Sequence, residues 1–224
     1  MNSENKMKMN ISENLKELKK ELPDNVSLVA VTKTKPIGDI MEAYNAGHRV
    51  FGENKVQEME SKWQELPKDI EWHMIGHVQR NKVKYMAPFV SLIHAVDSLR
   101  LLREINKEAR KNDRVINCLL QIKIAEEDSK FGMDKTEALQ LLDSNDFKKF
   151  ENIKIIGLMG MATFTDDEKQ VSDEFRSLKT LFDSIKEKHN TPVLSMGMSG
   201  DYKLAIKNGS NMVRVGSAIF GERG

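Results

Sequence analysis

The sequence predicts an α/β fold, a (β/α)₈ TIM barrel with an additional N-terminal helix. Short apolar segments of strand length alternate with longer segments in which apolar residues recur at helical spacing. Such alternation is typical of parallel strands joined by helical crossovers, and eight repeats of it close a barrel. An open doubly wound sheet commonly has about five to seven strands and a glycine-rich first turn. The first apolar segment here lacks that turn. We therefore expect one barrel domain over residues 1–224.

The composition is that of an ordinary soluble protein and excludes several other classes. Hydrophobic residues make up 39% of the 224 residues and charged residues 31%, with a formal net charge of +1. Charges that nearly cancel give no reason to expect nucleic acid or a membrane as a partner. Cys118 is the single cysteine, which excludes a disulfide framework and a thiolate metal site. The N-terminus is polar, unlike a secretory signal, and no apolar run nears the roughly 20 residues that span a bilayer. We expect a cytoplasmic monomer without a metal.

The expected elements begin with a helix over Ile11–Leu22, which follows a polar stretch, Met1–Asn10, that we expect to be frayed. The eight expected strands are the run from Ser27 that Pro36 stops, Arg49–Phe51, Glu71–Ile75, Val90–Val96, Val115–Ile124, Ile153–Met159, Pro192–Met196 and Met212–Val215. The helices expected after them are Ile37–Tyr44, Val56–Leu66, Leu99–Asn112, Thr136–Leu142 with Thr136 as its cap, Asp166–Lys188, Gly200–Lys207, and a short one opened by Gly216-Ser217.

A lysine at the end of the first strand carries the site prediction. The alternation of a strand puts Lys33 on the same face as Val29 and Val31. If that face is the barrel interior, the amine is desolvated, its pKa falls, and more of it is nucleophilic near pH 7. Such an amine is suited to attack an aldehyde and form an imine. The alternative is that Lys33 reaches solvent at the strand end, and spacing alone does not choose between Lys33 and Lys35.

Glycine and serine residues follow the seventh and eighth strands, where this fold commonly binds phosphate. Ser199-Gly200 opens one helix and Gly216-Ser217 opens another, so backbone N–H groups and the helix dipole are expected to hold an anion there. The alternative is that both pairs are ordinary helix caps. Arg214 stands two residues before Gly216 in an apolar strand, where a charge needs a partner. It either donates hydrogen bonds inside the site or points outward between helices.

Histidines and a basic segment suggest two other kinds of site, a zinc site and an anion contact, which the surrounding sequence does not favour. His73 and His77 have the spacing of a helical zinc pair, but the surrounding residues alternate as in a strand. His94 is expected to be a strand residue with its hydrogen bonds satisfied. The segment Arg80–Lys84 is expected to be a solvated face, although it could contact an anion.

These residues stand in a chain that resembles the pyridoxal-phosphate homeostasis proteins, single-domain relatives of the alanine racemase barrel. The resemblance runs in family order over nearly the whole chain. The matching segments are Ala30-Val-Thr-Lys-Thr-Lys-Pro36, Phe51-Gly-Glu-Asn-Lys-Val-Gln57, Trp72-His-Met-Ile-Gly76 with Gln79 and Asn81-Lys82, Ser129-Lys-Phe-Gly132, Gly157-Leu-Met159, Leu194-Ser-Met-Gly-Met-Ser199 with Asp201, and Met212-Val-Arg-Val-Gly-Ser-Ala-Ile-Phe-Gly221.

The resemblance implies that pyridoxal 5′-phosphate is bound as an imine to Lys33, and it selects Lys33 over Lys35. It further implies a phosphate cradle, an arginine facing the pyridine nitrogen and an amide bordering the ring. The residues so assigned are Met198, Ser199, Gly216 and Ser217 for the cradle, Arg214 for the nitrogen, and Asn54 for the ring.

The resemblance also leads us to expect a cofactor carrier that is not an enzyme. An arginine beside the pyridine nitrogen leaves the ring a weaker electron sink. The racemases take an acid/base tyrosine from a second domain, for which we expect no room before Gly224, and Tyr44, Tyr85 and Tyr202 are not placed to replace it. The expected role is storage of the cofactor and its delivery to apo-enzymes. The alternatives are a pyridoxal-phosphate racemase, a Schiff-base aldolase acting on a sugar phosphate, and a barrel that binds no ligand.

Overall fold

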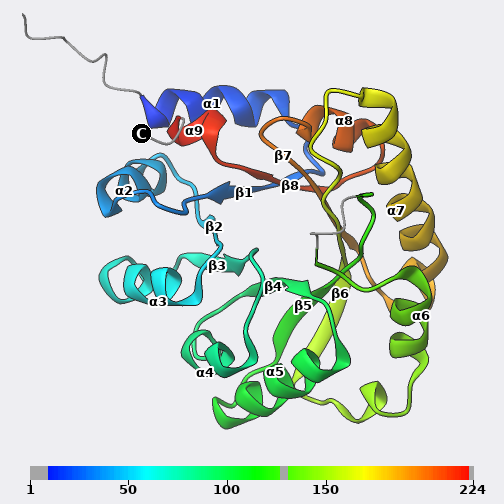
Figure 1. Cartoon of the computed structure of the whole chain (residues 1–224). Helices are drawn as coiled ribbons and strands as arrows, with labels where there is room; N and C mark the ends of the chain where they lie inside the picture. Colours follow the sequence, from blue (N-terminus) through cyan, green and yellow to red (C-terminus); the bar gives the residue numbers. More distant parts are fainter. Residues whose placement is uncertain (1–9, 127–130, 222–224) are drawn as a thin grey trace, which may run out of the picture.

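Eight parallel strands close into a barrel with helices packed around its outside (Figure 1). The structure, a computed structural model, describes residues 10–126 and 131–221. The strands follow one another around the barrel in chain order, and β8 pairs with β1 to complete it. The predicted (β/α)₈ barrel with an additional N-terminal helix is therefore confirmed. The expected fraying of residues 1–9, and Ser129-Lys130 of the fourth matching segment, lie outside the described residues.

The strands are short, as the apolar runs predicted. They are β1 Ser27–Val31, β2 Val50–Glu53, β3 Glu71–Met74, β4 Leu92–Val96, β5 Ile116–Gln121, β6 Ile153–Met159, β7 Val193–Met198 and β8 Met212–Val215. The helices are α1 Ile11–Glu21, α2 Ile37–Asn45, α3 Val56–Glu65, α4 Val83–Met86, α5 Leu99–Lys111, α6 Lys135–Asp143, α7 Glu168–His189, α8 Tyr202–Lys207 and α9 Ser217–Phe220, with 3₁₀ turns at Arg80–Lys82 and Phe147–Lys149.

Two apolar clusters divide the interior. The larger lies between the outer face of the strands and the helices, because alternate strand residues face outward and meet the apolar stripe of each helix. The smaller fills the barrel itself, and its buried members are Val29, Leu92, Ala95, Leu119, Met159 and Met212. Because side chains fill the barrel interior, a ligand can bind only at an end of the barrel, and in this fold that is the end where the strands finish.

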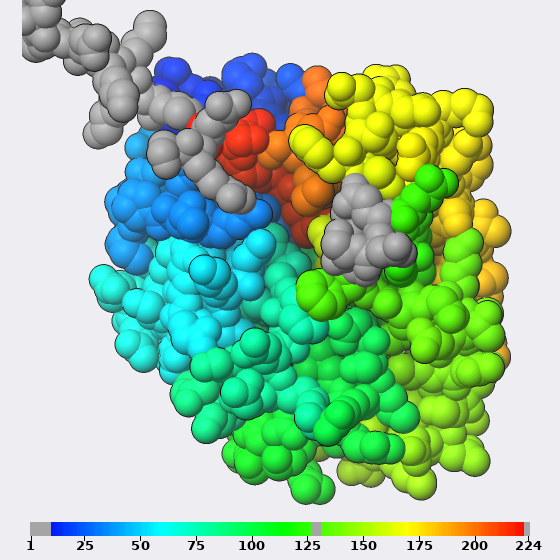
Figure 2. Space-filling view, viewed as in Figure 1, coloured from blue at the N-terminus to red at the C-terminus, as the bar shows by residue number. Residues whose placement is uncertain are grey.

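The first and last helices of the described chain lie side by side on the outside of the barrel. Helix α1 lies beside α9, and the side-chain amide of Asn14 donates to the backbone oxygen of Ile219 at 3.1 Å (Figure 1). In the space-filling view, atoms from the start of the chain adjoin atoms from its end (Figure 2). The additional helix therefore supports α9, which directly follows β8.

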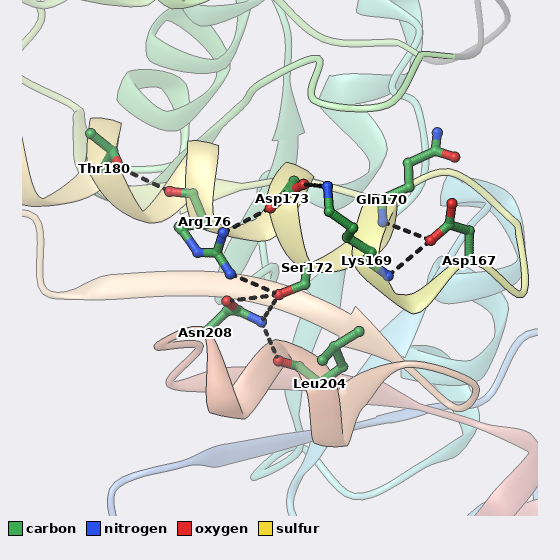
Figure 3. A network of polar contacts seen from close by, with 9 residues as sticks. All are labelled: Asp167, Lys169, Gln170, Ser172, Asp173, Arg176, Thr180, Leu204 and Asn208. Atoms are coloured by element: carbon green, nitrogen blue, oxygen red, sulfur yellow. Dashed lines mark hydrogen bonds and ion pairs between the residues drawn. The ribbon is translucent and has the colours of Figure 1, made fainter.

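Helix α7 is joined to α8 by side-chain hydrogen bonds rather than by apolar contacts alone. The amide nitrogen of Asn208 donates to Ser172 Oγ at 3.1 Å and to the backbone oxygen of Leu204 at 2.9 Å (Figure 3). Asp167 caps α7 by accepting from the backbone N–H groups of Lys169 and Gln170. These contacts fix α8, which follows the loop after β7.

Two local expectations were wrong, and a third was confirmed. The cap of α6 is Asp134 and not Thr136, because Asp134 and Glu137 form a reciprocal capping box. Strand β7 continues to Met198 instead of ending at Met196. The segment Arg80–Lys84 is a largely solvated face, as expected: Arg80, Asn81 and Lys84 are exposed on a 3₁₀ turn and the start of α4.

None of the helices in the described part of the chain combines the length and the apolar character needed to cross a bilayer.

Candidate functional site

A cavity of about 520 Å³ lies at the end of the barrel where the strands finish. Small-molecule sites commonly have volumes of roughly 300–1,000 Å³, so the cavity is large enough for a compact ligand. All of the residues predicted for the site line this cavity: Lys33, Asn54, Met198, Ser199, Arg214, Gly216 and Ser217. Residues from the two ends of the sequence are thus brought to one place by the closure of the barrel.

Lys33 lies on the interior face, as the alternation predicted. Val29 belongs to the cluster inside the barrel, and Val31 and Lys33 both line the cavity. The strand ends at Val31, but the alternation of side chains continues for two more residues. Thr34 then has a φ of 65°, in the left-handed region, so the backbone turns directly after Lys33.

Lys35 also lines the cavity, but its ammonium is engaged elsewhere. Its Nζ donates to the backbone oxygen of Phe220 at 2.9 Å and to that of Gly221 at 3.2 Å. These carbonyls end helix α9, where a cation is favoured by the helix dipole. Lys35 therefore ties the turn after β1 to the end of α9.

Arg214 is buried inside the barrel, and the alternative of an outward-pointing arginine is wrong. It is 3% exposed and lines the cavity. Its Nη1 donates to Ser195 Oγ at 2.6 Å and its Nη2 to the backbone oxygen of Gly160 at 3.2 Å. Burial lowers the pKa of Arg214 to about 10, so the guanidinium remains a cation at neutral pH. The cavity thus holds a fixed positive charge at its floor.

The orientation of Arg214 is supported by a chain of hydrogen bonds through the barrel. His94 Nδ1 lies 3.0 Å from Ser195 Oγ, and His94 Nε2 lies 3.0 Å from His73 Nδ1. A guanidinium can only donate, so Ser195 Oγ accepts from Arg214. A hydroxyl that donates to His94 Nδ1, and a His94 Nε2–H that donates to His73 Nδ1, would satisfy all three side chains. Burial lowers the pKa of His73 to about 3 and that of His94 well below its usual value, so both rings are neutral.

The expectation for His94 is therefore confirmed, and the zinc alternative for His73 and His77 is not supported. His73 lies inside the barrel, whereas His77 lines the cavity and stacks on Phe131 with ring centroids 4.0 Å apart. Across residues 10–126 and 131–221, no group of three or more His, Cys, Asp or Glu side chains is arranged to hold a metal ion.

The loops after β7 and β8 meet at the cavity. Ser199 Oγ accepts from the backbone N–H of Gly216 at 3.1 Å, and Asp201 accepts from the backbone N–H of Met198 at 2.6 Å. A Cβ on Gly216 would lie 3.1 Å from the backbone oxygen of Val31, so a residue without a side chain lets β8 approach β1 here. The backbone N–H groups that begin α9 point out of the helix end without helical partners, which favours an anion.

Gly76 packs against the backbone of Asn54, which lines the cavity. A side chain at position 76 is expected to destabilise the fold and to displace Asn54. A Cβ at Gly76 would lie 2.7 Å from Asn54 Cα and closer still to the Asn54 carbonyl oxygen. Gly76→Ala should therefore lower the free energy of unfolding by about 1–3 kcal/mol and displace Asn54. Gly38→Ala is the matched control, because a Cβ at Gly38 in α2 meets nothing within 4 Å. Urea unfolding measures both changes, and equal stabilities for the two variants would contradict this account.

Several cavity residues were not predicted from the sequence. They are Gln121, Phe131, Met161 and Phe164, together with Lys35. Gln121 ends β5 and its side chain donates to the backbone oxygen of Phe131 at 2.9 Å. The sequence prediction extended this strand to Ile124, so Gln121 was not recognised as a residue at a strand end. Phe164 lies in the loop after β6 and carries no pattern that would predict its position.

Comparison with known proteins agrees with this fold. The family model of the alanine racemase N-terminal domain matches residues 8–224, which defines the general class of barrel. A pyridoxal phosphate homeostasis protein of Aquifex aeolicus is 39% identical over 199 residues, which cover 88% of this chain and 86% of that protein. The chain belongs to the family of pyridoxal phosphate homeostasis proteins.

Solved structures show the same relation. PipY of Synechococcus elongatus superposes with a TM-score of 0.88 at 34% identity, over 94% of this chain and 100% of that one. A second PipY structure, with PLP bound, superposes with a TM-score of 0.85 at 33% identity and the same coverage. Alanine racemase of Clostridium difficile has a TM-score of 0.78 over 96% of this chain and 57% of its own, but at 13% identity it shows the fold alone.

Proposed function

We propose that this protein binds pyridoxal 5′-phosphate covalently through Lys33, and stores and delivers the cofactor within the balance of vitamin B6 and amino acids. The observation that carries the proposal is the convergence of Lys33, Ser199 and Arg214 on one cavity. The relatives that match over most of the chain carry the name of pyridoxal phosphate homeostasis proteins, and PipY has been solved with PLP bound.

The residues of the cavity fit the chemistry of this cofactor. An aldehyde needs an amine, which Lys33 supplies, and a phosphate needs several hydrogen-bond donors. We assign those donors to the hydroxyl of Ser199 and to the backbone N–H of Ser217, which opens α9. Met198 and Gly216 border the same place, and their own N–H groups donate to Asp201 and Ser199 and so hold the two loops together. Bound pyridoxal phosphate supplies an electrophilic carbon and an electron-withdrawing ring.

Arg214 argues against amino-acid turnover. Ser195 and Gly160 hold its guanidinium in place, and a cation fixed beside the ring nitrogen of the bound cofactor would oppose protonation of that nitrogen. The ring would then be a weaker electron sink. We therefore assign Arg214 to binding and to suppression of side reactions.

The tyrosines also favour a carrier over a racemase. A racemase needs acid/base groups on both faces of the reacting carbon, and Lys33 can serve one of them. Tyr44 Oη donates to Asp69 at 2.8 Å, and Tyr202 Oη donates to Glu21 at 3.1 Å. Tyr85 is 39% exposed in α4, and none of the three tyrosines of the sequence lines the cavity.

Two assays on the loaded protein test the proposal together. Alanine or serine incubated with it in deuterated water should show no exchange of the α-proton. An apo-enzyme that depends on pyridoxal phosphate should regain activity when mixed with it. Exchange that disappears in Lys33→Ala would make the protein an enzyme of the racemase type. Binding without transfer to the apo-enzyme would contradict delivery.

Ser199 provides a test of the phosphate cradle. Ser199→Ala removes a hydrogen bond to a charged group, worth roughly 1.5–3 kcal/mol, so the affinity for pyridoxal phosphate should fall about ten- to a hundredfold. Fluorescence or calorimetric titration measures this change. Ser172→Ala is the matched control, because Ser172 lies on α7, bonds Asn208 at the end of α8, and lies outside the cavity. Pyridoxal without its phosphate should bind much more weakly than the phosphate ester, and equal affinities would contradict the cradle.

A further inference from the structure

A group of charged side chains, two buried and one half-buried, holds the backbone next to Lys33. Lys62 belongs to α3, on the outer side of the strands, and is 6% exposed. Its ammonium donates to the backbone oxygen of Thr32 at 2.8 Å and to Glu53 Oε1 and Glu58 Oε1 at 2.7 Å each. An ammonium has three hydrogens, so these three oxygens use all of them.

The two carboxylates extend this contact to both neighbours of Lys33. Glu53 Oε1 accepts from Thr32 Oγ1 at 2.5 Å, and Glu58 Oε1 accepts from the backbone N–H of Thr34 at 2.6 Å. Thr34 has a φ of 65°, a left-handed conformation that is costly for a β-branched residue. A strained residue persists only where contacts around it hold it in place. For Thr34 that contact is the hydrogen bond from its backbone N–H to Glu58.

We propose that Glu53, Glu58 and Lys62, here named the charge clamp, are positioning residues that aim the amine of Lys33 into the cavity. This inference rests on the proposed function. The clamp does not touch the cavity, because none of its three members lines it. It acts through the peptides of Thr32 and Thr34, and fixing both of them restricts the directions open to the flexible lysine stem between them.

The energetic cost of the clamp supports a role beyond folding. Burial of an ion pair is often no better for stability than apolar packing of the same volume. Glu53 is fully buried, and its Oε2 has no hydrogen-bond partner among the described residues. Burial raises the pKa of Glu53, while Lys62 and Thr32 act in the opposite direction. Glu53 accepts from Thr32, the residue before Lys33, yet one of its carboxylate oxygens is unsatisfied within the described part of the chain. This arrangement is explained if the clamp positions the backbone on either side of Lys33.

The test compares two ligands with the same phosphate. Pyridoxal 5′-phosphate can link to Lys33, whereas pyridoxine 5′-phosphate has an alcohol in place of the aldehyde and cannot. Glu58→Ala should weaken the binding of pyridoxal 5′-phosphate roughly tenfold, because the covalent linkage is lost from a misdirected amine. Its affinity for pyridoxine 5′-phosphate should stay at the wild-type value. Glu58→Gln keeps an acceptor oxygen for Thr34 and should retain most of the linkage.

Two further variants separate positioning from general stability. Glu108→Ala removes a buried helical carboxylate that pairs with Lys107 and Lys111 on α5, away from the cavity, and should leave both affinities unchanged. Thr34→Gly removes the strain, because glycine adopts the left-handed conformation without cost. Linkage in the double variant Glu58→Ala/Thr34→Gly should therefore recover toward the wild-type level.

The outcomes distinguish this inference from the proposed function. Hydrogen exchange at the Thr34 amide needs no cofactor, and it should be slow in the wild type and fast in Glu58→Ala. Equal exchange in the two proteins, or equal losses for both ligands, would overturn the clamp. A wild-type protein that forms no linkage with pyridoxal 5′-phosphate would instead refute the proposed function, with the exchange result still deciding whether Glu58 holds Thr34.

Discussion

Lys33→Ala is expected to abolish the covalent linkage to pyridoxal phosphate and the near-visible absorbance that accompanies it. The linkage needs an amine within the cavity, and Lys33 is the lysine there that we assign to it. Absorbance spectra of the variant after addition of the cofactor measure the loss. The phosphate loops remain intact, so the variant should still bind some cofactor without the linkage.

Lys35→Ala is the matched control for this prediction. Lys35 stands two residues away and lines the same cavity, but its ammonium donates to the carbonyls of Phe220 and Gly221. Its removal should leave the absorbance unchanged and lower stability modestly, by roughly 1–2 kcal/mol, because its two hydrogen bonds are only partly buried. Absorbance that survives in Lys33→Ala and disappears in Lys35→Ala would reverse the assignment.

Acidification from pH 7 to pH 5 is expected to destabilise the protein before its carboxylates titrate. Burial lowers the pKa of His48 to about 4 and that of His73 to about 3, against 6.5 for an exposed histidine. Between these values the unfolded chain binds protons that the folded protein does not, so stability falls as pH falls. Each of these histidines should lower the free energy of unfolding by about 2 kcal/mol over this interval.

Chemical unfolding at several pH values measures this effect, and His48→Gln provides its control. His48 Nε2 lies 2.8 Å from the backbone oxygen of Val50, a contact that the amide of glutamine can make without titrating. The variant should show a shallower fall. Glu53 acts in the opposite sense, because its raised pKa adds stability as pH falls toward 4.5, but it is one group against the buried histidines. A wild-type free energy that is constant from pH 7 to pH 5 would contradict the prediction.

The barrel was predictable because its strands are short apolar runs with clear ends. The bounds of β6 and β8 agree with the expected segments to the residue. The expected seventh strand ended at Met196, before Gly197. Gly197 has a φ of 99° and lies where the pairing with β8 shifts register between Ser195 and Met198, yet β7 continues through it to Met198. The cap at Asp134 was present in the sequence as an Asp and a Glu three residues apart.

Most of the predicted site residues lie just after the end of a strand, and Arg214 lies one residue before the end of β8. Alternation along β1 predicted the direction of Lys33, and the fold rule predicted that Ser199 and Gly216 would meet. Contacts that support the site depend on pairs far apart in sequence. His94 and Ser195 are 101 residues apart, and Lys62 and Thr32 are 30 apart. No local pattern of residue types predicts such pairs, so the charge clamp and the support of Arg214 required the structure.

Borohydride reduction of the loaded wild-type protein, followed by peptide mass mapping, tests the central claim most directly. Reduction makes the linkage permanent, so the modified lysine can be identified without any substitution. We expect a pyridoxyl phosphate adduct on Lys33, in near-stoichiometric amount, with Lys35 unmodified. An adduct on another lysine, or no adduct under saturating cofactor, would contradict the assignment of this cavity as a pyridoxal phosphate site anchored by Lys33.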